Sequence, residues 1–438
     1  MGEDKMTADS APFRLGIAGL GTVGAGVVKL VQQHGDMLAD RAGRRIEISA
    51  VSARSQGADR GVDLSGYDWV QDARDLASRD DVDCVVEMIG GSEGVAKDLT
   101  ESALSAGKSV VTANKALLAE HGAALAALAG EHGSALACEA AVAGGIPAIK
   151  ALKEGLSGNQ ITALYGILNG TCNYILTEMR QTGRDFADVL AEAQALGYAE
   201  ADPAFDVDGV DAAHKLAILA ALAYGRHVDF SSVHIEGIRQ ISATDVAFAR
   251  ELGFRIRLVG MARETEAGVM QSVYPCMVPR ESMLGAVDGV FNAVAMDGDF
   301  VDRVTLVGRG AGEGPTASAV MADIVDLAAG RASPVLGIPA DRLQPARSVP
   351  VDQRTGPYYL RVMVQDQPGV VADIAAALRD QGVSIEALIQ RARSDSDAVP
   401  VVITTHDVRE DAFQRAVSAI SGLEAVTQDP CVIRIEAL

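Results

Sequence analysis

One segment of the sequence combines the residue types that proton transfer requires. Asp211 and Lys215 are four residues apart, a spacing that places two side chains on one face of a helix. Every residue from 216 to 223 is apolar, so we expect this helix to be buried, and a lysine beside a cleft there can act as a general acid or base. The chain has eight lysines against thirty arginines, and only lysine can release a proton near neutral pH. A surface ion pair is the alternative interpretation of the same spacing.

Three other segments carry polar groups that could bind a ligand. Lys115 follows the predicted strand 109–112, and the carboxyl ends of strands are where α/β sheets bind ligands, although a lysine that merely starts a helix is equally compatible. Glu200 could hold an ammonium group or belong to a plain acidic loop. Glu139 opens a tight turn that ends at Pro147. Its carboxylate and the free carbonyls of the turn could seat a monovalent cation or simply bend the chain.

A glycine pattern near the amino terminus predicts a dinucleotide site. Gly19, Gly21 and Gly24 follow the apolar run 13–18 and precede a helical pattern, which is the context that this motif requires. Such glycines let the backbone approach a pyrophosphate, and the helix N-terminus supplies N–H donors. The acid that usually follows by roughly twenty residues, to bind a ribose 2′-hydroxyl, is absent. Arg54 could instead pair with a 2′-phosphate, which favours NADP over NAD; a solvated surface arginine is the alternative.

The elements around these residues predict an α/β chain of several domains. Strands alternate with helices up to residue 140, as in a Rossmann-type doubly wound parallel sheet. An α+β texture follows, with antiparallel strands predicted at 256–262, 269–278 and 286–295, and the residues from 357 onward follow the order βαββαβ of a ferredoxin-like unit. We therefore predict a disordered tail at 1–12 and a dinucleotide-binding domain at 13–138, to which residues 305–330 return. A substrate-binding, catalytic and oligomerisation domain follows at 139–304. A linker with few core contacts at 331–356 leads to a separate domain at 357–438.

The composition limits which partners the protein can bind and in which cellular compartment it is expected. The 438 residues include 38 basic and 59 acidic side chains, and the net charge of −21 would repel nucleic acid and anionic membranes. No run approaches the roughly 18 apolar residues that suggest a membrane-spanning helix. Five widely spaced cysteines without a CxxC pair argue against a disulfide framework or a zinc site and fit a reducing cytoplasm.

Taken together, these motifs resemble those of the homoserine dehydrogenases. The matching segments run in order from about residue 13 to 330 and are Gly19–Gly24, Thr112–Lys115, Glu139–Pro147, Gly166–Thr171, Gly197–Pro203, Asp206–Lys215 and Gly308–Thr316. The tail after Gly356 resembles an ACT domain, a small-ligand regulatory module, with Asp366-x-Pro-Gly369 at its first strand–helix turn.

The resemblance implies an activity and assigns roles to residues. The activity is the NAD(P)H-dependent, reversible reduction of L-aspartate 4-semialdehyde to L-homoserine, in threonine, methionine and isoleucine biosynthesis. The roles are Lys215 as general acid and base, Lys115 as its partner or alternate, Asp211 as the residue that orients Lys215, and Glu200 and Asp206 as ligands of the substrate ammonium, with Tyr198 and Thr171 nearby.

The same resemblance implies contacts for a cofactor and a cation. The cofactor, NADP with NAD as the alternative, would contact Gly19, Gly21, Thr22, Val23, Gly24, Arg54, Lys115 and Gly312. A monovalent cation, for which we expect sodium, would bind the Glu139 side chain and the carbonyls of Val142, Gly144 and Ile146.

The tail is expected to be a removable regulator. Asp366, Gly369 and Gln390 would bind an effector, for which we expect L-threonine, and a chain that ends near Ser348 should then fold and stay active. The alternative is a tail that only holds a homodimer or homotetramer together.

Two other functions fit parts of the sequence. An acylating semialdehyde dehydrogenase needs a cysteine nucleophile, and Cys138 and Cys172 are suitably placed, but no base motif surrounds them. A non-catalytic sensor of a dinucleotide and an amino acid would not require the pair Asp211 and Lys215. The sequence therefore favours the dehydrogenase.

Overall fold

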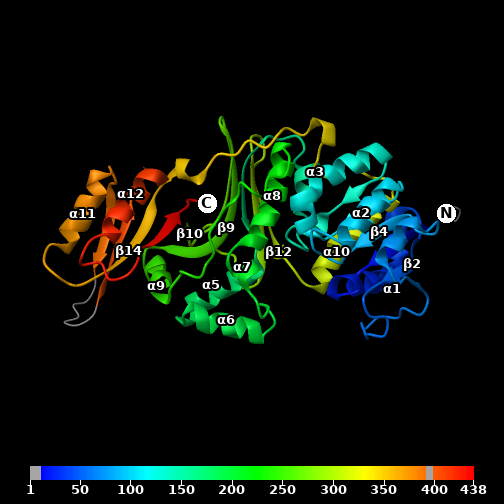
Figure 1. The fold of residues 1–438 in the computed structure, drawn as a ribbon, viewed down its shortest axis with the longest axis horizontal. Coiled ribbons are helices and arrows are strands. Elements are labelled where there is room, and N and C mark those ends of the chain that lie inside the picture. Colours follow the sequence, from blue (N-terminus) through cyan, green and yellow to red (C-terminus); the bar gives the residue numbers. More distant parts are fainter. Residues whose placement is uncertain (1–10, 391–397) are drawn as a thin grey trace, which may run out of the picture. The chain divides into compact units, whose positions relative to one another are not determined.

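The computed structural model describes residues 11–390 and 398–438, and the chain divides into two compact units (Figure 1). Unit 1 comprises residues 1–164, 214–231 and 292–346, and unit 2 comprises residues 165–213, 232–291 and 347–438. The predicted tail at 1–12 lies outside the described residues except for its last two positions. Within the described ranges, no helix is both long and apolar enough to cross a membrane.

Unit 1 is built on a parallel sheet with the order β3-β2-β1-β4-β5-β6. Its strands are β1 (Phe13–Ala18), β2 (Ile46–Ser52), β3 (Asp68–Trp69), β4 (Cys84–Glu87), β5 (Ser109–Thr112) and β6 (Leu136–Ala137), and its helices include α1 (Thr22–Ala42), α2 (Val95–Ser105) and α3 (Lys115–His132). The strand order reverses between β1 and β4, which is the point where open α/β sheets bind nucleotides. The predicted Rossmann-type sheet is confirmed.

A late segment of the chain packs against the first helix of unit 1. Helix α10 (Glu313–Ala328) shares a hydrophobic core with α1, to which Val27, Val28 and Val320 contribute. At Gly26 the two helices approach so closely that an added Cβ would lie 3.0 Å from the Cβ of Ala317. The chain therefore returns, after residue 300, to the helix that follows the glycine motif.

The middle of the chain supplies further elements to both units. Unit 1 contains β12 (Asp302–Arg309), its neighbour β11 (Phe291–Gly298) except for Phe291, the short helix α4 (Ala148–Lys150) and part of α8 (Val210–Tyr224), while β7 (Ile161–Ile167) crosses the division. Unit 2 contains α5 (Gly170–Thr182), α6 (Phe186–Ala195), α7 (Ala204–Val207) and α9 (Ala243–Glu251).

An antiparallel ladder forms the first part of unit 2. Strands β9 (Phe254–Thr265) and β10 (Gly268–Pro279) pair along all twelve residues of each, and β8 (His234–Ile235) runs parallel to β10. The two strands predicted at 256–262 and 269–278 are confirmed. The strand predicted at 286–295 begins only at Phe291, because the carbonyl of Gly285 and the carboxylate of Asp288 form a turn that binds buried Arg257.

The tail folds as the predicted βαββαβ unit. Its elements are β14 (Tyr358–Val364), α11 (Val370–Asp380), β15 (Ile385–Gln390), β16 (Val399–Thr405), α12 (Glu410–Ser421) and β18 (Cys431–Ile435). The strands pair antiparallel in the order β18-β14-β16-β15, and the two helices pack on the sheet around Phe413 and Ile374. This confirms the ferredoxin-like fold.

The last strand of the tail continues the sheet of unit 2. Strand β18 pairs in parallel with β10, with Arg434 opposite Cys276 and Ile435 opposite Met277. The Arg434 guanidinium donates to both carboxylate oxygens of Glu236 at 2.8 and 2.9 Å and to Glu410 at 2.8 and 2.9 Å. Burial raises the pKa of Glu236, but hydrogen bonds from His234 and Arg434 outweigh it and lower that pKa to about 2.

Two more buried acids tie the tail to the rest of unit 2. Glu436 accepts from Arg354 at 2.8 Å and from the Tyr274 hydroxyl at 2.9 Å. Asp245, in the first turn of α9, accepts from Arg361 and from the Tyr359 hydroxyl of β14. These contacts are those of a domain core rather than of a removable appendage.

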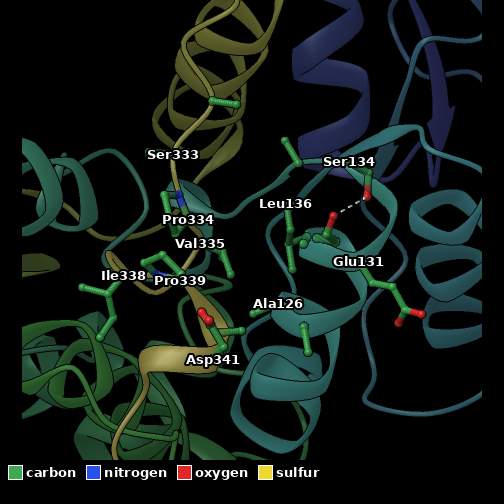
Figure 2. Close-up of a pocket in the computed structure, with 16 residues that line it drawn as sticks. Ala126, Glu131, Ser134, Leu136, Ser333, Pro334, Val335, Ile338, Pro339 and Asp341 are labelled. Carbon is green, nitrogen blue, oxygen red and sulfur yellow. Dashed lines mark hydrogen bonds between the residues drawn. The ribbon is translucent and has the colours of Figure 1, made fainter.

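The segment 331–356 is packed, so the expectation of few core contacts is wrong. Val335, Leu336, Leu343 and Val349 are all buried, although the segment has no regular period that its sequence could have revealed. Its first part and the end of α3 border a cavity of about 680 Å³, and Figure 2 shows Pro334, Val335 and Ile338 on one wall with Ala126 and Leu136 on the other. A chain that ended near Ser348 would lose β18 and leave Glu236 and Asp245 without their arginines, so we no longer expect it to fold normally.

The Arg434 contacts can be tested by substitution. Arg434→Met should lower the free energy of unfolding by about 3–5 kcal/mol, because it leaves two carboxylates without their cationic partner. The matched control is Arg379→Met, which removes an exposed pair with Asp380 and should cost less than about 1 kcal/mol. Denaturant unfolding measures both changes. Equal values for the two variants would contradict a structural role for the Arg434 contacts.

Candidate active site

A cavity of about 820 Å³ in unit 1 opens beside the glycine motif, and its lining includes Gly19, Gly21 and Arg54. Gly19 has a φ of 98°, and a Cβ there would lie 2.5 Å from the carbonyl oxygen of Met88. A Cβ at Gly24 would lie 1.9 Å from the carbonyl oxygen of Gly19. The backbone packing of this turn therefore requires glycine at both positions, whether or not a ligand is bound. Nothing lies within 4 Å of a Cβ at Gly21, so the space there is open for the phosphates of a dinucleotide to approach the backbone.

Two arginines, Arg54 and Arg60, are among the residues that line this cavity. Arg54 is exposed and follows β2, as predicted. Arg60 also lines the cavity, and its guanidinium donates to the carbonyls of Leu20, Ala58 and Ser55. Arg60 was not predicted, because its hydrogen-bond partners are backbone carbonyls, which any residue type can provide. The sequence shows only that a second arginine lies in the loop after β2.

The remaining predicted cofactor residues lie elsewhere in unit 1. Thr22 and Val23 begin α1, and Gly312, with a φ of 121°, immediately precedes α10. An ion pair of 3.5 Å joins Lys29, in the third turn of α1, to Glu313, the first residue of α10. The predicted cofactor residues that are not part of the cavity lining are Thr22, Val23, Gly24, Lys115 and Gly312.

Lys115 is positioned by a buried network at the ends of β4 and β5. The Glu87 carboxylate is fully buried, accepts the Thr112 hydroxyl at 2.6 Å and accepts two N–H groups of the loop that follows β4. Asn114 caps the N-terminus of α3 and donates to the carbonyl of Gly91 at 2.7 Å. Lys115 is thus the first residue of α3, at the carboxyl end of β5, as predicted. Sequence reasoning missed Glu87, although an acid that ends an apolar strand was a visible signal.

The turn predicted to hold a cation contains a carboxyl group with an unusual environment. Both Glu139 carboxylate oxygens accept backbone N–H groups, from Ile149 at 3.0 Å and from Lys150 at 2.8 Å. Burial and the neighbouring Asp323 raise the pKa of Glu139 to about 7. The side chain therefore holds the start of α4, whether or not a cation is bound.

The backbone of this turn is left-handed at two consecutive residues. Ala143 and Gly144 have φ values of 56° and 51°, and a Cβ at Gly144 would lie 2.3 Å from the carbonyl oxygen of Gly310. Val142 and Ile146, whose carbonyls are the other predicted ligands, are buried on either side. The turn is thus fixed by its contact with the second glycine-rich segment.

Lys215 and Asp211 are both buried on α8, with 9% and 4% of their surface exposed. Their four-residue spacing places them on one face of this continuous helix, so the interpretation as a surface ion pair is wrong. Lys215 belongs to unit 1 and Asp211 to unit 2. Within unit 1, His214 stacks on Phe230 with ring centroids 4.1 Å apart, which fixes the turn of α8 that carries Lys215.

Asp206, a predicted substrate ligand, and Asp211, predicted to orient Lys215, lie near one another through Asn169. Its side-chain nitrogen donates to Asp206 at 2.8 Å and to Asp211 at 2.9 Å. Asp206 is half-buried on α7, whereas Asn169 is buried at the residue before α5. No role was predicted for Asn169 itself, although it lies within the matching segment Gly166–Thr171.

Thr171 and Tyr198 also come together in unit 2. The Thr171 hydroxyl donates to the carbonyl of Tyr198 at 2.8 Å, and the Tyr198 ring packs on Tyr174 with centroids 4.9 Å apart. Glu200 lies two residues further on, in the exposed loop between α6 and α7, with its backbone carbonyl bonded to Gln194. Its side chain thus has room to meet a ligand.

The predicted effector residues lie together in the tail. The Gln390 side chain donates to the Asp366 carboxylate at 3.5 Å, and Gly369 precedes α11 with a φ of 100°. The turn between β14 and α11 therefore lies beside the end of β15.

The glycine-turn cavity on a parallel sheet, the buried lysine and the ferredoxin-like tail define a dinucleotide-dependent oxidoreductase with an ACT domain. Models of three families match: the NAD-binding domain of homoserine dehydrogenase over residues 19–139, homoserine dehydrogenase over 147–325, and the ACT domain over 358–425. The chain belongs to the homoserine dehydrogenase family.

Relatives match over nearly the whole chain. The homoserine dehydrogenase of Neisseria gonorrhoeae is 45% identical over 433 residues, which cover 98% of this chain and 99% of the relative. The crystal structure of a homoserine dehydrogenase from Thiobacillus denitrificans has a TM-score of 0.92 at 41% identity and covers 98% of this chain and 99% of its own. A hyperthermophilic archaeal homoserine dehydrogenase in complex with NADPH has a TM-score of 0.62 at 26% identity, covering 72% of this chain and 97% of its own.

Proposed function

We propose that this chain catalyses the NAD(P)H-dependent, reversible reduction of L-aspartate 4-semialdehyde to L-homoserine, a step toward threonine, methionine and isoleucine. The observation that carries the proposal is the buried Lys215 on α8, one helical turn after Asp211, in a chain with a dinucleotide cavity. The names of the relatives support the same reaction.

Lys215 acts as the proton donor in this proposal. When bound, the reduced nicotinamide supplies a hydride to the carbonyl carbon. Lys215 stabilises the negative charge that develops on the carbonyl oxygen and protonates it, an effect that is strong where water is excluded. Asp211 orients Lys215, and Lys115 is its partner or alternate. In the reverse direction Lys215 takes the proton from the hydroxyl group of homoserine.

The acids of unit 2 account for recognition of an amino-acid substrate. Asp206 and Glu200 bind the substrate ammonium, and Thr171 and Tyr198, which are hydrogen-bonded to each other, lie beside them. Two carboxylates favour a cationic group and disfavour an aldehyde that lacks one.

The acylating alternative is weaker because neither cysteine is suited to act as the nucleophile. Burial raises the pKa of Cys138 to about 12, which disfavours the thiolate that this chemistry needs. The Cys172 thiol is buried and donates to the carbonyl of Asp206. A sensor without catalysis would not require a lysine at position 215.

NADP is the preferred cofactor in this proposal. Arg54 is exposed at the cavity and supplies the cation that a 2′-phosphate requires, where NAD-binding relatives of this fold use an acid. Arg60 is held near the same loop by backbone carbonyls and adds positive charge. The archaeal homoserine dehydrogenase was solved with NADPH, which supports this choice.

A sodium ion in the turn after Glu139 would complete the site. The carbonyls of Val142, Gly144 and Ile146 and the Glu139 carboxylate are oxygen donors, which suit a hard cation. A nearby cation would also offset the effect of burial and of Asp323, which together make ionised Glu139 unfavourable.

The tail regulates the enzyme in this proposal. L-threonine binds at Asp366, Gly369 and Gln390, and the contacts of β18 with β10 carry the effect from the tail to the antiparallel ladder within unit 2. We also propose that the enzyme acts as a homodimer or homotetramer in the cytoplasm. Its domains would be a dinucleotide-binding domain at 13–138 to which 305–330 returns, a substrate-binding, catalytic and oligomerisation domain at 139–304, and a regulatory domain at 357–438.

Replacing Lys215 tests the proposed reaction. Wild-type protein should oxidise NADPH on addition of L-aspartate 4-semialdehyde, and Lys215→Ala should lower kcat by roughly 10²–10⁴-fold while NADPH binding is retained. Lys215→Arg should fail as well, because guanidinium does not exchange protons near neutral pH. Lys29→Ala, at a half-exposed lysine, is the control and should keep full activity. Near-normal turnover in Lys215→Arg would reduce Lys215 to an electrostatic role.

Replacing Arg54 tests the cofactor preference. Arg54→Asp should raise the Michaelis constant for NADPH by roughly 10–100-fold, the equivalent of about 1.5–3 kcal/mol for a charge-assisted contact. The Michaelis constant for NADH in the same variant should change little. If both constants shift equally, Arg54 does not read the 2′-phosphate and the preference for NADP has no support.

A further inference from the structure

We propose that Asn169 is a positioning residue that holds the two acids Asp206 and Asp211 in their working geometry. The inference rests on the proposed function, in which Asp206 binds the substrate ammonium and Asp211 orients Lys215. It goes beyond that function because it assigns a specific task to a side chain that touches neither the substrate nor the reacting atoms.

The orientation of the Asn169 amide is fixed by its two ends. Its oxygen accepts the backbone N–H of Cys172 at 2.8 Å, which caps the N-terminus of α5. Its nitrogen must then face the other way, and there it donates one hydrogen bond to Asp206 and one to Asp211. Both N–H bonds and one oxygen lone pair are thus used, in a side chain that is only 4% exposed.

The position of Asn169 explains how one side chain joins three elements. It follows β7 and precedes α5, while Asp206 lies on α7 and Asp211 in the first turn of α8. The Cys172 thiol reinforces the same junction, since it donates to the carbonyl of Asp206 at 3.2 Å. A substitution of Asn169 should therefore change the positions of both carboxylates, Asp206 and Asp211.

Electrostatics explain why an amide is needed here. Two carboxylates that share a partner repel each other, and a donor placed between them favours the ionised form of both. An arginine would also bridge them, but its charge would compete with the substrate ammonium for Asp206. The neutral amide orients the acids and leaves their charge for the substrate and the lysine.

The chain offers two variants that keep the helix cap and lose the amide donors. Aspartate and serine are as good as asparagine at the position before a helix. Asn169→Asp therefore keeps the bond to Cys172 but brings a third carboxylate to Asp206 and Asp211. Asn169→Ser adds no charge, and the serine side chain is too short to reach both acids. This variant therefore tests the proposal even if Asn169→Asp does not fold.

Kinetics distinguish positioning from capping. With NADPH saturating, both variants should lower kcat/KM for the semialdehyde on the order of 10²-fold, through a higher KM as well as a lower kcat, because both acids are displaced. The KM for NADPH should stay close to that of the wild type in both variants, and the melting temperature of Asn169→Ser, which keeps the helix cap and adds no charge, should fall less than that of Asn169→Asp. Activity in Asn169→Ser close to that of the wild type would overturn the proposal, because the helix cap would then be the whole role of Asn169.

The pH profile provides a second readout that a structural role would not move. In Asn169→Asp, three carboxyl groups meet at one point beside the Cys172 thiol, and acidification protonates one of them and restores a single donor. The activity of this variant relative to the wild type should therefore rise as the pH falls. A constant ratio across the pH range would count against the proposal.

Crystal structures of the wild type and Asn169→Ser test the geometry without any assay. The carboxylates of Asp206 and Asp211 should move apart while the N-terminus of α5 stays in place; unmoved carboxylates would refute the positioning role. If the wild type fails to reduce the semialdehyde, the proposed function alone is refuted, because this structural comparison needs no activity.

Discussion

The constraint on which this structure depends is that a buried carboxylate must be given partners. The chain has 21 more acidic than basic side chains, and it buries several acids: Glu87, Glu139, Asp211, Asp245, Asp323, Glu410 and Glu436. An ionised carboxylate without a partner costs far more in a protein interior than any one apolar contact returns. The partners come from distant parts of the sequence, as when Tyr359 of β14 meets Asp245 of α9. Satisfying these acids therefore fixes where the elements lie within each unit.

The kind of partner decides what each acid can do. Burial raises the pKa of Glu410 and of Glu436, but arginines outweigh it and keep both pKa values below the ordinary value, so these acids stay ionised and structural. Glu139 has backbone N–H groups for partners and Asp323 for a neighbour, and its pKa is raised. Asp206 and Asp211 share a neutral amide, which orients them without cancelling their charge.

Features that depend on neighbours in sequence were predictable. The turn of Gly19 and Gly24, the buried helix of Lys215 and the βαββαβ order of the tail all follow from local spacing and apolar periodicity. Features that depend on one distant partner were not. Asn169 meets acids 37 and 42 residues away, and Arg434 meets Glu236 198 residues away, so no local pattern predicts these contacts. The burial of segment 331–356 was not predicted for a related reason, because its buried residues follow no helix or strand period.

The most direct test of the account is to follow the hydride itself. Reduction of L-aspartate 4-semialdehyde with NADPH that carries deuterium at the transferable position of the nicotinamide C4 should place one deuterium on the carbon that bears the hydroxyl group of L-homoserine. Mass spectrometry and proton NMR of the product detect that label and locate it. Homoserine formed without deuterium at this carbon, or no homoserine at all, would contradict the account.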